Sequence, residues 1–160
     1  MIHSSQRGFT LLIAIILSTV ALVMGLALAD AAYKQVVLSS SAKQSQVAFY
    51  AADSALECAL YYDQQFVAFA PGGSYPQGNI RCESRQVTNF VQSSYSGGSR
   101  LTTFTVPCAG GGVSASVSIY KQGSGTCGSN GATSCLYATG YNTCNASDPN
   151  RFERGLKVLY

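Results

Sequence analysis

The hydrophobic pattern of the chain begins with an uncharged apolar run at residues 9–29. At about 1.5 Å of rise per residue, a helix of roughly 21 residues crosses the ~30 Å hydrocarbon layer of a bilayer. The polar segment before the run ends in Gly8, whereas a cleavable secretory signal has its small cleavage-site residues after the apolar region. The pattern therefore predicts a membrane-spanning helix rather than a secretory signal.

Apolar positions continue at three-to-four-residue spacing beyond this run, and no proline occurs before Pro71. The spacing predicts one long helix over residues 9–70, apolar all round at residues 9–30 and amphipathic at residues 31–70. Such a helix is roughly 90 Å long, so its second half needs a surface to pack on. Glycines and prolines cluster at residues 71–78 and predict the boundary between the helix and a separate head.

Apolar and polar residues alternate with period two in the rest of the chain, which is typical of half-buried strands. The alternation predicts strands at residues 101–106, 113–120, 134–139 and 154–160. Residues 85–92 fit either a short helix or an edge strand. One face of an antiparallel sheet is expected to cover the amphipathic half of the helix, because both apolar surfaces are then hidden.

The predicted fold class is therefore α+β. It consists of a long N-terminal α-helix, with a protruding transmembrane half and a packed C-terminal half, against a small antiparallel β-sheet head with disulfides. The predicted divisions are a leader at residues 1–8, an apolar helix at 9–30, an amphipathic helix at 31–70 and a head at 71–160.

Six cysteines, an even number in a chain with an export element, predict disulfides formed in an oxidising compartment. A zinc site lacks its ligands, because the chain has no CxxC pair and its single histidine, His3, lies in the leader. No metal site is therefore expected.

The predicted strand order also gives the cysteine pairs. If the strand at residues 113–120 pairs antiparallel with residues 134–141, the cysteine before the first strand lies near the one after the second. The two cysteines at the connecting loop then lie together, which leaves the helix cysteine for the one that follows the helix boundary. The predicted pairs are Cys108–Cys144, Cys127–Cys135 and Cys58–Cys82.

The formal net charge is only +3, and the cations are scattered along the chain. The sequence has no run of like charge of the kind that marks a nucleic-acid site. Sequence-specific binding of nucleic acid is therefore not expected. Nonspecific contact with DNA stays open, because it needs only a few exposed cations and aromatic faces.

The motifs that carry chemistry in other proteins lack their structural context here. Residues 123–128 match GxGxxG, but no predicted helix follows them to hold a pyrophosphate, so a glycine-rich hairpin loop is favoured. The triplet at residues 145–147 matches a glycosylation acceptor and is interpreted as a turn. No histidine outside the leader is present to act as a base, and we expect no catalytic residues, no enzyme activity and no cofactor.

Two carboxylates, Asp53 and Glu57, stand at positions i and i+4 of the predicted amphipathic helix. Like charges at this spacing repel by a few tenths of a kcal/mol on an isolated helix. One interpretation is an ordinary solvated helix face. The other is that one of them meets an arginine or lysine of the head or of a neighbouring subunit.

The start of the apolar run has a specific pattern. Arg7-Gly8 is followed by Phe9-Thr10-Leu11-Leu12 and by a helix that changes from apolar to amphipathic. This pattern resembles the type IV pilin and pseudopilin family, and residues 45–63 are similar to the PilX-type minor pilins. The resemblance implies that prepilin peptidase cuts between Gly8 and Phe9, that the leader leaves with its basic residue Arg7, and that the new amino terminus is methylated.

One position departs from the family pattern. Family members usually carry glutamate five residues after the cut, where this chain has Ile13. The resemblance implies that the helix packs into a filament core with other pilin subunits. Prepilin peptidase and, before assembly, the membrane are the other expected partners.

The resemblance implies a structural function as a filament subunit, of the minor pilin or pseudopilin kind. The chain is expected to cross the inner or cytoplasmic membrane once before assembly and to lie in an extracellular filament at the cell surface afterwards. The alternative is a signal-anchored extracytoplasmic surface or binding protein that keeps residues 1–8 and does not polymerise.

Overall fold

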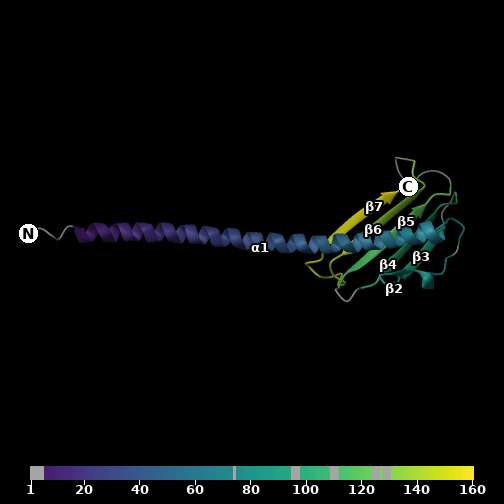
Figure 1. The fold of residues 1–160 in the computed structure, drawn as a ribbon, viewed down its shortest axis with the longest axis horizontal. Coiled ribbons are helices and arrows are strands. Elements are labelled where there is room, and N and C mark those ends of the chain that lie inside the picture. Colours follow the sequence, from purple (N-terminus) through teal and green to yellow (C-terminus); the bar gives the residue numbers. More distant parts are fainter. Residues whose placement is uncertain (1–5, 74, 95–97, 109–111, 124–126, 128–130) are drawn as a thin grey trace, which may run out of the picture. The chain divides into compact units, whose positions relative to one another are not determined.

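The computed structural model describes the chain except for residues 1–5, 74, 95–97, 109–111, 124–126 and 128–130. One long helix is followed by seven strands and one short 3-10 helix (Figure 1). The elements are α1 (Gln6–Phe66), η1 (Gln77–Asn79), β1 (Arg81–Cys82), β2 (Arg85–Gln86), β3 (Thr88–Ser94), β4 (Arg100–Val106), β5 (Ser114–Lys121), β6 (Ser134–Tyr141) and β7 (Glu153–Leu159). The predicted α+β class, with a long N-terminal helix and an antiparallel sheet, is confirmed.

The chain forms two compact units, residues Met1–Ala42 and Lys43–Tyr160. The described residues of the first unit, 6–42, all belong to helix α1, and every residue from 9 to 40 is exposed. The first fully buried helix position is Ala48. The first ten residues of the predicted amphipathic stretch, 31–40, are thus exposed, and burial begins further along the helix.

The five-stranded sheet has the order β3-β4-β5-β6-β7, and each strand pairs antiparallel with the next along the chain. Strands β5 and β6 pair in the predicted sense, with Ser114 opposite Tyr141 and Lys121 opposite Ser134. The segment at residues 85–92, for which two conformations were open, is extended. It contributes β2, which forms a two-stranded hairpin with β1, and the start of edge strand β3.

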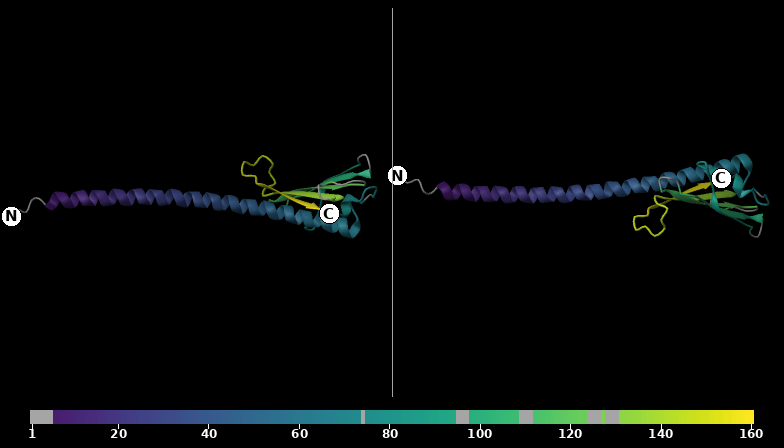
Figure 2. Two further views of the ribbon diagram at one scale, coloured as in Figure 1. Left: turned by 90° about the horizontal axis from the view of Figure 1, so that it is seen from above. Right: turned by 90° about the horizontal axis from the view of Figure 1, so that it is seen from below.

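The part of α1 in the second unit lies along one face of this sheet (Figure 2). Alanines at alternating four- and three-residue spacing form its contact surface, and the alternating inward side chains of β4, β5 and β6 form the other side. The fully buried residues include Ala48, Ala52, Ala55 and Ala59 of the helix and Phe104, Val117, Ile119, Leu136 and Ala138 of the sheet. Small helix residues let the two backbones approach closely, and this approach places one helix face directly on the central strands.

Helix α1 ends at Phe66, so the expected end at residue 70 is wrong. Val67 has a left-handed backbone, with φ of 51°, and its N–H donates to the carbonyl oxygen of Asp63 at 3.1 Å. This arrangement is a helix C-cap that glycine usually provides, whereas a β-branched residue adopts it at a cost in strain. The helix therefore stops where the sequence gives no glycine or proline signal.

Three disulfides hold the second unit, and they are the pairs expected from the strand order: Cys58–Cys82, Cys108–Cys144 and Cys127–Cys135. The first joins α1 to β1, and the second joins the segment after β4 to the segment after β6. In the chain-entropy account each such link contributes about 2–4 kcal/mol by restricting the unfolded chain. A head of this size gains a large part of its stability in this way.

Candidate processing junction and membrane segment

Helix α1 contains a stretch that is long and apolar enough to span a membrane, with a mean hydropathy of 2.8 and no burial against the rest of the chain. Its large apolar side chains are between 39% exposed, at Ile13, and 72% exposed, at Leu28. A contiguous apolar surface of this extent marks an interaction with lipid or with other protein surfaces. The structure therefore supports the prediction, made from the sequence, of one helix that could cross a membrane.

The hydroxyl groups of Ser18 and Thr19, in the middle of this segment, are satisfied within the helix itself. Ser18 Oγ donates to the carbonyl oxygen of Ile15 at 2.9 Å, and Thr19 Oγ1 donates to that of Ile16 at 2.8 Å. Hydrogen bonds to the preceding turn remove the cost of an unpaired hydroxyl in hydrocarbon. The two polar residues are therefore compatible with a membrane location.

The apolar surface does not end with the membrane-length run. Asp30 and Lys34, the first charged residues after it, form an i, i+4 ion pair at 2.8 Å. Beyond Asp30 the large side chains of Tyr33, Val36 and Leu38 are still 68–70% exposed. Residues 9–38 therefore form an exposed apolar surface about 45 Å long, which exceeds the ~30 Å hydrocarbon layer by about half.

The predicted cleavage site lies near the beginning of α1. Arg7, Gly8 and Phe9 belong to the helix, which the structure describes from Gln6 onward. The rest of the predicted leader, including His3, lies outside the described residues. Ile13, the residue at the family's glutamate position, lies in the same helix among the exposed apolar residues.

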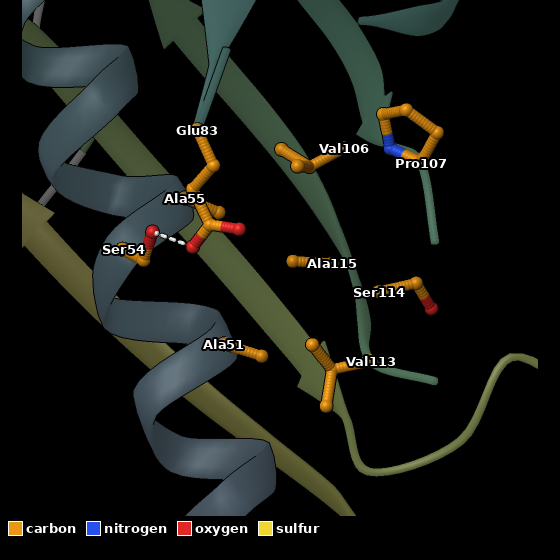
Figure 3. Close-up of a pocket in the computed structure, with 9 residues that line it drawn as sticks. All are labelled: Ala51, Ser54, Ala55, Glu83, Val106, Pro107, Val113, Ser114 and Ala115. Carbon is orange, nitrogen blue, oxygen red and sulfur yellow. Dashed lines mark hydrogen bonds between the residues drawn. The ribbon is translucent and has the colours of Figure 1, made fainter. Parts of the chain in front are cut away.

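One cleft in the second unit involves both the helix and the β1–β2 hairpin (Figure 3). Ser54 of α1 donates a hydrogen bond to the Glu83 carboxylate at the hairpin turn, at 2.6 Å. The cleft has a volume of about 10 Å³, which is room for about one water molecule. This cleft is therefore a joint between the helix and the hairpin and is too small for an organic substrate.

A buried ionic cluster fastens the last turn of α1 to the sheet. Asp63 has a side chain that is only 1% exposed, and Lys121 of β5 lies 2.7 Å from its Oδ2 atom. Tyr160 donates its phenol O–H to the same oxygen. Burial of the phenol, together with this hydrogen bond, raises the pKa of Tyr160 well above its usual value near 10. Sequence analysis counted Asp63 only as a helix carboxylate and missed the cluster, because its cationic and phenolic partners come from distant parts of the chain.

Replacing Asp63 by asparagine is expected to lower the free energy of unfolding by about 1.5–3 kcal/mol, because Lys121 and Tyr160 lose a charged hydrogen-bond partner. Thermal or denaturant unfolding of the full chain measures the loss. The same substitution at Asp53, which has no ion-pair partner among the described residues, is the matched control and should change stability by less than about 0.5 kcal/mol. Equal effects of the two substitutions would show that the cluster contributes nothing specific.

The remaining sequence candidates have simple outcomes. Asp53 and Glu57 form no ion pair with the head among the described residues, and Glu57 is exposed. The glycine-rich match at residues 123–128 lies largely outside the described residues.

Comparisons of the chain with protein-family models, with curated proteins and with solved structures find no match. The function must therefore be argued from the chain's own residues and geometry.

Proposed function

We propose that this chain is a structural subunit of a type IV pilus-like filament, of the minor pilin or pseudopilin kind. The observation that carries the proposal is the combination of the Arg7-Gly8-Phe9 junction with an exposed apolar helix surface that is longer than the hydrocarbon layer of a bilayer is thick. A pilin-type subunit needs both features, since its helix first lies in the membrane and then packs against other helices.

The length of the apolar surface favours protein packing over simple anchoring. A single anchor needs about 20 apolar residues. Here the exposed apolar side chains continue past Asp30 and Lys34 to Leu38, and lipid does not reach all of them at once. The internal Asp30–Lys34 pair leaves the net charge of this stretch at zero, which lowers the cost of covering it with neighbouring helices.

The proposed course of events follows from these features. The chain crosses the inner or cytoplasmic membrane once, prepilin peptidase cuts between Gly8 and Phe9, and the new amino terminus is methylated. Assembly then moves the apolar helix from lipid into the filament core beside other pilin subunits, with the disulfide-linked head at the cell surface. The role is structural and not enzymatic, and any contact with nucleic acid is nonspecific.

A second candidate function is a signal-anchored surface or binding protein that does not polymerise. Ile13 favours this alternative, because the chain lacks the carboxylate that pilins usually carry at that position. The two functions differ in the fate of the leader, since the anchored protein keeps residues 1–8.

Processing is the direct test of the proposal. Intact-mass analysis of the protein from its native host is expected to give a mature chain that begins at Phe9 and carries a methylated amino terminus. Replacing Gly8 by valine should block cleavage, because a branched side chain replaces the small residue at the cut, whereas Gly8→Ala should be processed markedly better. Recovery of only the full-length chain, beside correctly processed sibling subunits, would exclude the pilin proposal and favour the anchored protein.

A further inference from the structure

One disulfide of the second unit is exposed at both of its cysteines. Cys108 and Cys144, which form it, are both exposed residues. Each of the other two disulfides has one buried member, Cys82 or Cys135, which is only 1% exposed. Exchange of a disulfide requires a thiolate to reach one of its sulfur atoms, so the rate of exchange depends on access. The Cys108–Cys144 link is therefore the one that thiols in solution reach most easily.

Backbone carbonyl groups also screen the other two disulfides. Cys58 Sγ lies 3.6 Å from the carbonyl oxygen of Arg81, and Cys135 Sγ lies 3.0 Å from that of Cys127. The partial negative charge of an oxygen atom at such a distance repels a thiolate that approaches from the same side. Access and charge therefore both slow exchange at these two links.

The exposed disulfide joins two segments at one end of the sheet. Cys108 follows β4 and Cys144 follows β6, so the link passes across the start of β5, the strand between them. Backbone pairing extends to this end of all three strands, because Ala115 lies opposite both Val106 and Gly140. The strand pairing therefore keeps the sheet register in place whether the link is closed or open.

The link holds the connection between β6 and β7, residues 142–152, which projects from the second unit (Figure 2). At the base of this connection Asn142 and Phe152 exchange two hydrogen bonds, and Asn142 Nδ2 also donates to Gln44 Oε1 of α1 at 2.9 Å. Cys144 is the covalent anchor of the part beyond the base. The link is thus placed to control how firmly the connection is held beside the packed part of the helix.

We propose that Cys108–Cys144 is a thiol–disulfide exchange site, which a dithiol opens while the other two disulfides stay closed. A thiolate of the dithiol forms a bond with one of the two exposed sulfur atoms, and the bond between Cys108 and Cys144 breaks. Its electron pair stays on the other sulfur, which takes a proton from water. The second thiol of the dithiol then displaces the first sulfur from the mixed disulfide. The head gains two electrons and two protons, and the dithiol leaves as an internal disulfide.

The exchange works as a local switch. In the opened state the connection beyond Asn142 is no longer tied to the end of β4, and only the hydrogen bonds at its base hold it to the sheet and to Gln44. The inference goes beyond the proposed function, because it requires neither leader cleavage nor a filament. It requires only a head that lies in a compartment where thiols and disulfides exchange.

The order in which the disulfides open is the first test, with the full chain in detergent micelles under native conditions. Dithiothreitol is added, free thiols are alkylated with one label at successive times, and the remaining disulfides are then reduced and alkylated with a second label. Peptide mass spectrometry gives the opened fraction of each pair. Cys108–Cys144 should open at least about tenfold faster than either other pair. Opening of all three pairs at one rate, or earlier opening of another pair, would overturn the proposal.

The effect of opening is measured on the double variant Cys108→Ser, Cys144→Ser. The amides of Asp148 and Arg151 donate hydrogen bonds within the connection, and their hydrogen exchange should accelerate at least about fivefold, while the amides of β5 and β6 keep their protection.

The matched control is the double variant Cys127→Ser, Cys135→Ser, which should leave exchange in the connection unchanged. Unchanged exchange at Asp148 and Arg151 in the first variant, or equal acceleration by both variants, would show that the exposed link does not hold the connection. The time course with dithiothreitol on the original chain needs no substitution and decides the matter if either variant fails to fold.

Discussion

Replacing Gly140 by alanine is expected to destabilise the second unit by about 4 kcal/mol or more, which is beyond the usual 1–3 kcal/mol for overpacking a core. A Cβ atom at this position lies 2.1 Å from the carbonyl oxygen of Ala48 and 2.3 Å from the backbone nitrogen of Ala52. Both atoms belong to the backbone of α1. No side-chain rotation relieves the clash, so the helix has to move away from the central strand β6.

The measurement is unfolding of the full chain, followed by circular dichroism, for the Gly140→Ala variant. Gly155→Ala is the matched control, because Gly155 lies on the adjacent strand β7 and a Cβ atom there meets only the Ala138 carbonyl oxygen, at 3.9 Å. The control should unfold within about 0.5 kcal/mol of the original chain. Ala48→Gly should not rescue the Gly140 variant, since the contact is with backbone. Equal stability of the two glycine variants would contradict the close helix–strand approach.

This contact explains why alanines predominate on the buried helix face, where Leu56 is the one large apolar residue among the described positions. Ala52, Ala55 and Ala59 keep the helix axis close enough to the sheet for the Gly140 backbone to touch the helix backbone. Close packing makes such a core sensitive to a single added methyl group. The attachment of the helix to the sheet is consequently tight within the second unit.

The strands were predictable from the sequence because their signals are local. The period-two alternation of residues 113–120 places Val117 and Ile119 on one face, and the antiparallel pairing that β5 forms with β6 is the one assumed from the sequence. Cysteine positions then follow from the strand ends. For this reason the predicted pairs Cys108–Cys144 and Cys127–Cys135 are the ones found in the structure.

Other features depend on contacts that no local pattern encodes. The helix ends at Phe66, and Val67 after it has a left-handed conformation that valine disfavours, so the tertiary fold overrides the local preference. The sequence around Gly140 does not show that the backbone of α1 packs directly against this glycine. The partners of Asp63 come from β5 and from Tyr160, almost one hundred residues further along the chain. The predicted processing junction is the reverse case, because the pattern that predicts it lies wholly in the linear sequence around Gly8.

The second large expected effect concerns abundance in the filament and follows from Ile13. Burial of an isolated amine or carboxylate in an apolar core costs several kcal/mol even after relaxation. In the pilin family, the glutamate at this position matches the terminal amine of an adjoining subunit and removes that cost. In the proposed filament, a subunit with Ile13 would receive neutralisation at Phe9 from a neighbour's glutamate but would offer none to the next subunit. Addition of a further subunit at its side is therefore disfavoured.

We expect this chain to be at least about tenfold less abundant in sheared filaments than the most abundant subunit, since each 1.4 kcal/mol of lost pairing is a factor of ten in equilibrium. Quantitative mass spectrometry of filaments from the native host gives the ratio directly. Ile13→Glu should raise the abundance of this subunit by supplying the missing carboxylate, whereas Ile16→Glu, which places a carboxylate three residues away, should lower it. An abundance equal to that of the main subunit, or an equal response to the two glutamate variants, would show that Ile13 does not limit incorporation, and the position of this subunit would then be set by the head.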